Sequence, residues 1–131
     1  MRPDFSETLA HKIQGGADLL LMPSRFEPCG LTAMYALKYG MISVVRATGG
    51  LDDTVIQWDA SAGKGNGLKF AELSADTLAR AVGDAVAVYK QPQLWQKLMR
   101  EAMACDFSWQ QAARVSMRNC TRGWYSPRKR E

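Results

Sequence analysis

Two short stretches of the chain carry residue types that could bind a ligand with phosphates and hydroxyls. The first, residues 24–32, contains the carboxylate of Glu27 and then Gly30, where a helix is expected to begin. The second, residues 48–50, reads Thr-Gly-Gly. A carboxylate accepts strong hydrogen bonds from sugar hydroxyls, and the free N–H groups at a helix N-terminus favour an anion. The backbone N–H groups of residues 30–32 are therefore candidates for holding a diphosphate.

Each of these features also has a purely structural interpretation. Glu27 could be a solvated loop acid, and the glycine pair at 49–50 could serve only as a turn. Cys29 is interpreted as a small buried residue, because no histidine lies nearby in the sequence to activate it. Arg25 and Arg46 could meet a phosphate, or pair with Glu27 and Asp53.

Alternating strand and helix patterns must position these stretches. Apolar or β-branched runs predict strands at residues 19–22 and 42–45, and residues 67–70 are expected to form a short third strand. Periodic apolar positions and capping residues predict helices over residues 5–14, 31–39, 51–57 and about 75–89, then from 92 and from 108. This alternation predicts a parallel sheet with helices on both faces. Ligands bind beyond the carboxyl ends of such strands, where the 24–32 and 48–50 loops would face one another if their strands are neighbours.

Composition restricts the other possibilities. The chain has 131 residues, 47% hydrophobic and 23% charged, which is enough for one domain with a core. Much of the net charge of +4 comes from residues 128–130, interpreted as a solvated end, so no nucleic-acid partner is expected. Three distant cysteines and a single histidine, His11, make a zinc site or disulfide framework unexpected. No signal peptide or membrane span is recognised, which predicts a cytoplasmic location without membrane contact.

Several motifs together resemble bacterial glycogen synthase and starch synthase. They are the Pro-Ser-Arg-Phe-Glu-Pro-Cys-Gly-Leu-Thr run at 23–32, Tyr-Gly at 39–40, Thr-Gly-Gly-Leu at 48–51, Asp-Thr-Val at 53–55 and Asp-Phe-Ser-Trp at 106–109. The likeness covers roughly residues 5–118. It implies the C-terminal portion of a GT-B glycosyltransferase, folded as a partial Rossmann-like three-layer sandwich. Residues 1–118 would then be part of the nucleotide-sugar-binding domain, and residues 119–131 the end of the last helix and a basic tail.

The resemblance also implies an activity and a set of site residues. Such enzymes transfer glucose from ADP-glucose to the non-reducing end of an α-1,4-glucan, with retention of configuration and without a metal cofactor. Glu27 would be the catalytic-site carboxylate that contacts the glucosyl hydroxyls. The residues expected to bind the nucleotide sugar are Arg25, Cys29, Gly30, Leu31, Thr32, Thr48, Gly49 and Gly50.

The departures from the family define the alternatives. The family's N-terminal domain, which would bind the glucan, is not recognised in this chain, so the isolated chain is expected to be inactive. One alternative is an inactive remnant or split-subunit module that associates with itself or a partner through an exposed sheet edge. Another is a GT-B transferase for a different nucleotide sugar. Ala33, Ser43 and Asp52 also stand where the family more usually has Gln, Pro and Ala.

Overall fold

The computed structural model describes residues 6–111 and 113, which form alternating helices and strands. In chain order the elements are α1 (Glu7–Gly16), β1 (Leu19–Met22), α2 (Leu31–Tyr39), β2 (Ile42–Arg46), α3 (Gly50–Thr54), β3 (Gly67–Phe70), α4 (Ala75–Tyr89) and α5 (Pro92–Met103). In this part of the chain, no helix has the length and apolar character needed to cross a bilayer.

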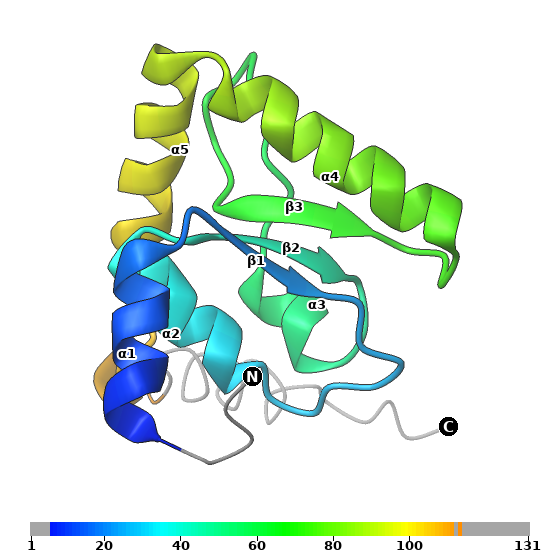
Figure 1. Ribbon diagram of the computed structural model, residues 1–131. Coiled ribbons are helices and arrows are strands. Elements are labelled where there is room, and N and C mark those ends of the chain that lie inside the picture. The colour runs from blue at the N-terminus through cyan, green and yellow to red at the C-terminus, as the bar shows by residue number, and fades with distance from the viewer. Residues whose placement is uncertain (1–5, 112, 114–131) are drawn as a thin grey trace, which may run out of the picture.

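The three strands form one parallel sheet in the order β1-β2-β3. The partner of Leu21 on β1 is Val44 on β2, and the partner of Val44 on β3 is Leu68. Helix α4 covers the sheet on one side, while α2 and α3 lie on the other (Figure 1). The predicted short parallel sheet with helices on both faces is confirmed.

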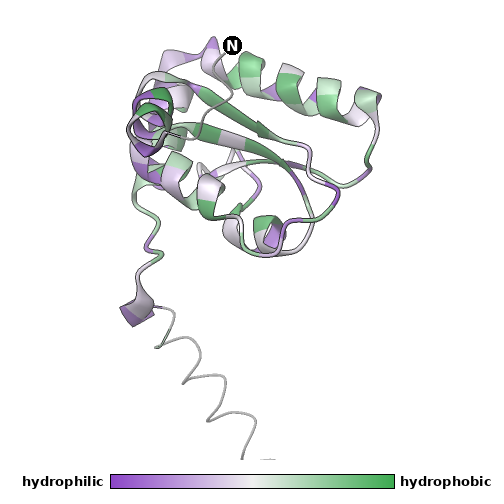
Figure 2. Ribbon diagram, turned by 60° about the horizontal axis from the view of Figure 1, so that its bottom comes forward, coloured by the Kyte–Doolittle hydropathy of each residue, from purple (hydrophilic) through white to green (hydrophobic). Residues whose placement is uncertain are grey.

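Two apolar clusters fill the space between the layers. The larger joins β2 and β3 to α4 and α5, and the smaller joins β2 to α2 and α3. Figure 2 shows the strands as mostly hydrophobic and the helices as mixtures of hydrophobic and hydrophilic residues. Residues 42–45 of the central strand are fully buried, as expected for a parallel strand covered on both faces. This rigid centre positions the loops that follow each strand.

Most predicted boundaries are confirmed to within a residue, but α1 runs over Glu7–Gly16 rather than 5–14, and α3 is shorter than predicted. Helix α3 ends at Thr54 rather than near residue 57, because the side chain of Asn66 accepts a hydrogen bond from the Ile56 N–H at 2.6 Å. The backbone that makes this hydrogen bond is extended, so the helix ends before it.

Apolar residues on the later helices differ in burial. On α4, Ala81 and Ala85 are buried, whereas Val86 and Tyr89 are exposed. Trp95 on α5 is buried, but Trp109 is 89% exposed.

The predicted cap of the last helix is present. The hydroxyl of Ser108 accepts a hydrogen bond from the Gln111 N–H at 3.3 Å. Most of the helix predicted from residue 108 and the predicted 119–131 tail lie outside the described residues.

Candidate functional site

The loop after β1 folds back on itself around Glu27. Pro23 follows the strand directly, since proline cannot donate to a sheet ladder. The half-buried Glu27 carboxylate accepts a hydrogen bond from the Gly30 N–H at 3.2 Å. Gly30 then begins α2 with a φ of 75°, a conformation that glycine adopts far more readily than other residues. The carboxylate therefore sits beside the N-terminus of α2.

The loop after β2 is in direct contact with this first loop. The Gly50 N–H donates to the Glu27 carbonyl at 2.8 Å. A Cβ atom added to Gly50 would lie 2.5 Å from the backbone carbonyl of Cys29. At Gly49, whose φ is 48°, an added Cβ would collide with the Glu27 carbonyl oxygen. The glycine pair is therefore more than a turn, because it allows two backbones to touch.

The start of α2 is open to solvent beside these glycines. Leu31 and Thr32 are exposed, and the N-cap residue Gly30 has no side chain that could accept a hydrogen bond from the first turn. Thr48 is half-buried, and its carbonyl accepts from the Leu51 N–H at 3.1 Å at the start of α3. The helix dipole of the nine-residue α2 gives this end a partial positive charge. The arrangement can hold an anion next to a carboxylate that can accept hydroxyl hydrogen bonds.

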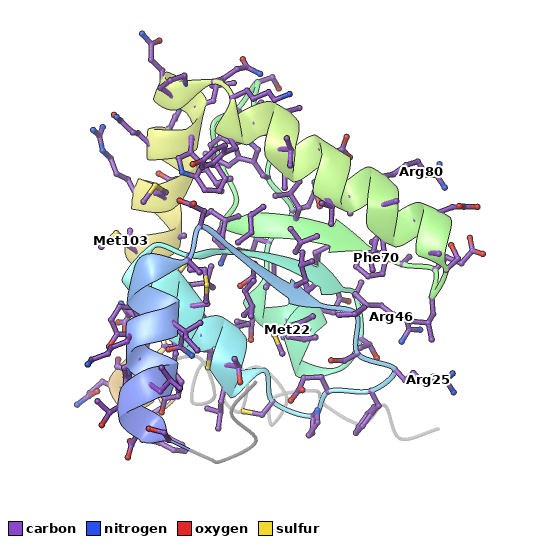
Figure 3. The ribbon with its side chains drawn as sticks, viewed as in Figure 1. Met22, Arg25, Arg46, Phe70, Arg80 and Met103 are labelled. Carbon is purple, nitrogen blue, oxygen red and sulfur yellow. The ribbon has the colours of Figure 1, made fainter. Side chains whose placement is uncertain are left out.

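The two arginines of the region have different environments. Arg25 is exposed and points away from the loop (Figure 3). Arg46 is half-buried and donates to the carbonyl oxygens of Ser24, Arg25 and Ala71. The proposed pairing of these arginines with Glu27 or Asp53 is not observed in the described part of the chain, where Lys69 pairs with Asp52 at 2.7 Å.

The structure also shows where Cys29 and His11 lie. Cys29 is exposed, so the interpretation that it is a small buried residue was wrong. His11 lies on α1, where its Nδ1 is 2.9 Å from the Tyr39 hydroxyl and its ring meets that of Tyr35 edge-on. These contacts tie α1 to α2 and support a packing role for the histidine.

The fold and the two touching loops match a known family. Residues 4–105 match the family described as "Glycosyl transferases group 1". Since the match covers more than half of the chain, the chain belongs to this family of glycosyltransferases. The motifs at residues 23–32 and 48–51 fall within the matched segment.

Individual relatives are more specific than the family match. The glycogen synthase of Koribacter versatilis is 49% identical over 118 residues, covering 90% of this chain and 24% of that protein. Glycogen synthase 2 of Geobacter metallireducens is 52% identical over 109 residues, covering 83% of this chain and 22% of that protein. The resemblance to glycogen synthase is thus confirmed, and the chain spans about a quarter of the length of these relatives.

A solved structure supports the same fold assignment. The catalytic domain of starch synthase IV from Arabidopsis thaliana, bound to ADP and acarbose, matches with a TM-score of 0.80 and 36% sequence identity. The match covers 91% of this chain and 25% of that one. The predicted GT-B class is therefore confirmed for this portion of the fold.

Two residues with structural roles in this region were not recognised from the sequence. Arg46 was considered only as a phosphate ligand or ion-pair partner, and its contacts with backbone carbonyls depend on three strands being adjacent. Asn66 was not singled out from the sequence, yet its buried amide fixes the segment after α3. A polar residue directly before the short strand β3 is the one local signal that could have suggested this.

Proposed function

We propose that the chain carries part of the donor-sugar site of a retaining glucosyltransferase that uses ADP-glucose. The reaction would break the bond between the glucosyl anomeric carbon and the diphosphate and form a bond from that carbon to a hydroxyl oxygen at the non-reducing end of an α-1,4-glucan. In this proposal the glucan binds mainly to a part of the enzyme outside this chain. The absence of a metal cofactor and a cytoplasmic location remain predictions.

Each proposed role uses a group on one of the two touching loops. Glu27 would accept hydrogen bonds from the glucosyl hydroxyls. The N–H groups of Leu31 and Thr32, at the start of α2, would face the diphosphate and stabilise the negative charge that develops as it departs. Gly49 and Gly50 would form the facing wall. Arg25, Cys29, Gly30 and Thr48 complete the proposed donor-binding set.

The observation that carries this proposal is the contact between the loops. The 2.8 Å hydrogen bond from Gly50 to the Glu27 carbonyl joins the carboxyl ends of two adjacent parallel strands. This is where open α/β sheets bind ligands. The relatives named glycogen synthase, and the starch synthase domain solved with ADP, support ADP-glucose as the donor.

Calorimetric titrations of the chain with ADP-glucose, ADP and AMP test the proposal. ADP-glucose and ADP are expected to bind weakly, in the millimolar range, because only one wall of the cleft is present. AMP, which lacks the second phosphate, should bind more weakly still. No heat with millimolar ADP would contradict the proposed site.

A transfer assay tests the expectation that the isolated chain is inactive. Most of the electrostatic stabilisation and the acceptor site would lie outside the chain, so no labelled glucose should enter glycogen. Incorporation by the chain alone, abolished by Glu27→Ala, would overturn that expectation.

The non-enzymatic alternative is favoured by one observation. β1 lies at an edge of the described sheet, and Leu21 on this strand is 47% exposed. An exposed apolar edge strand can pair with a second chain. Size-exclusion chromatography with light scattering tests this alternative. A stable dimer would support self-association through the sheet edge, and a monodisperse monomer would argue against it.

A further inference from the structure

We propose that Arg46 is a positioning residue that fixes the Glu27 loop by hydrogen-bonding backbone carbonyls, and is not a ligand of the donor phosphates. The inference deepens the proposed function, on which the meaning of this loop as a donor site rests. Arg46 is the last residue of β2, the central strand. Its guanidinium lies between the loops that leave the two outer strands (Figure 3).

The hydrogen bonds of Arg46 join all three strand ends. Its Nη1 donates to the carbonyl of Arg25 at 2.8 Å and to that of Ser24 at 3.4 Å, both in the loop after β1. Its Nε donates to the carbonyl of Ala71 at 3.2 Å, directly after β3. The backbone continues this link, because the Ala47 N–H donates to the Phe70 carbonyl at 2.8 Å.

The position of Glu27 depends on these contacts. Arg46 holds the first part of the loop at Ser24 and Arg25, and the Gly50 N–H holds the Glu27 carbonyl two residues further on. The carboxylate itself is turned back toward the Gly30 N–H. If the arginine contacts are lost, the carbonyl of Glu27 is free to move away from Gly50, and the carboxylate moves with it.

The geometry of the contacts distinguishes this role from phosphate binding. The guanidinium uses two different nitrogens to reach carbonyls on opposite sides of β2. A lysine at this position keeps the positive charge, but all its donors sit on one nitrogen, so it does not reproduce the planar two-nitrogen fork that reaches both loops. A phosphate ligand would tolerate Arg46→Lys better than Arg46→Met, whereas a bridging residue should tolerate neither.

Amide hydrogen exchange followed by NMR tests the role without requiring activity. The probe is the Gly50 N–H, and the internal reference is the Trp58 N–H, which donates to Gly67 at 2.7 Å. Arg46→Lys and Arg46→Met are compared with Arg80→Lys and Arg80→Met, since Arg80 is exposed on α4 (Figure 3). Both Arg46 variants should speed Gly50 exchange by about tenfold, a typical effect of losing a charged hydrogen bond. Trp58 exchange and both Arg80 variants should remain as in the wild type.

Three results would overturn the proposal. Wild-type Gly50 exchange in Arg46→Lys would mean that a positive charge alone is enough to hold the Glu27 loop. Equal acceleration at Trp58 would mean that Arg46 contributes only general stability, and equal effects in the Arg80 variants would mean that the change is not local.

An ADP titration of the same variants separates this inference from the proposed function. If the wild-type chain binds ADP, Arg46→Lys should weaken binding about as much as Arg46→Met, and unchanged affinity in Arg46→Lys would contradict a positioning role. If the wild type does not bind ADP, faster Gly50 exchange still supports loop positioning, while the donor-site assignment fails.

Discussion

The backbone N–H of Gly50 donates a hydrogen bond to the carbonyl oxygen of Glu27 at 2.8 Å. The two residues are far apart in the sequence, and the contact forms because β1 and β2 are adjacent and parallel. It brings the carboxylate candidate and the glycine pair into one site. The consequences of this contact can be measured by substitution.

Gly50→Ala should separate the two loops. The new Cβ would lie 2.5 Å from the Cys29 backbone, which must then move. We expect a loss of about 1–3 kcal/mol in unfolding free energy, typical of overpacking, and loss of ADP binding. Urea denaturation and ADP titration measure the two effects.

The matched control is Gly83→Ala on α4. An added Cβ there has no neighbour within 4 Å, so the substitution should raise stability by about 0.5–1 kcal/mol through helix propensity. Equal behaviour of the two variants would show that the loops are not in close contact.

Part of this site could be predicted from the sequence because its signals are local. Pro23 ends β1, Gly30 precedes α2 and residues 67–70 form a short strand, as expected. The alternation of strands and helices was sufficient to predict a parallel sheet and the loops at its carboxyl edge.

The rest depends on contacts between distant residues. Helix α3 ends early because Asn66, a dozen residues later, accepts from the Ile56 N–H. The bridging role of Arg46 requires knowledge of the strand order. The exposure of Trp109 shows that apolar character alone did not indicate burial at that position.

Glu27→Gln should separate sugar recognition from phosphate binding. The substitution removes a negative charge beside the α2 N-terminus, where the diphosphate is proposed to bind. We therefore expect ADP affinity to be retained or increased, while any preference for ADP-glucose over ADP is reduced. Calorimetry with both ligands measures the difference, and a large loss of ADP affinity would instead assign Glu27 to loop structure alone.

Asn66 and Ser43 form a matched pair of buried polar residues. The Asn66 side chain, 2% exposed, accepts from the Ile56 N–H and donates to the Thr54 carbonyl at 3.1 Å. Asn66→Ala would leave these backbone groups unpaired, and we expect a loss of about 2–4 kcal/mol in unfolding free energy.

The Ser43 hydroxyl is buried on β2 without a hydrogen-bond partner among the described residues. Ser43→Ala removes no such bond there, so stability should stay the same or rise by up to about 1 kcal/mol. Urea denaturation measures the unfolding free energy of both variants. A Ser43→Ala loss as large as that of Asn66→Ala would contradict this account of the core.

Asp59 should titrate below its ordinary range. The hydrogen bond donated by the Ser61 hydroxyl, followed by those from the Ala62 and Ser61 N–H groups, lowers the pKa of Asp59 below its usual value of 3.8. A lowered pKa in the folded state adds stability above the unfolded pKa, which is lost as pH falls through the folded value. Ser61→Ala should raise the pKa toward 3.8 in a carbon NMR titration of the Asp59 carboxyl. An unchanged pKa in that variant would show that the hydroxyl contact is unimportant.

The central claim is that the touching loops after β1 and β2 form a donor diphosphate site. Its most direct test is an ADP titration of the isotope-labelled chain, with backbone amide shifts followed by NMR. We predict saturable shifts concentrated at Gly30, Leu31, Thr32, Gly49 and Gly50, with little change at Gly63 and Gly65 in the distant 59–66 loop. No saturable shift with millimolar ADP, or shifts centred on residues outside the two loops, would contradict the claim.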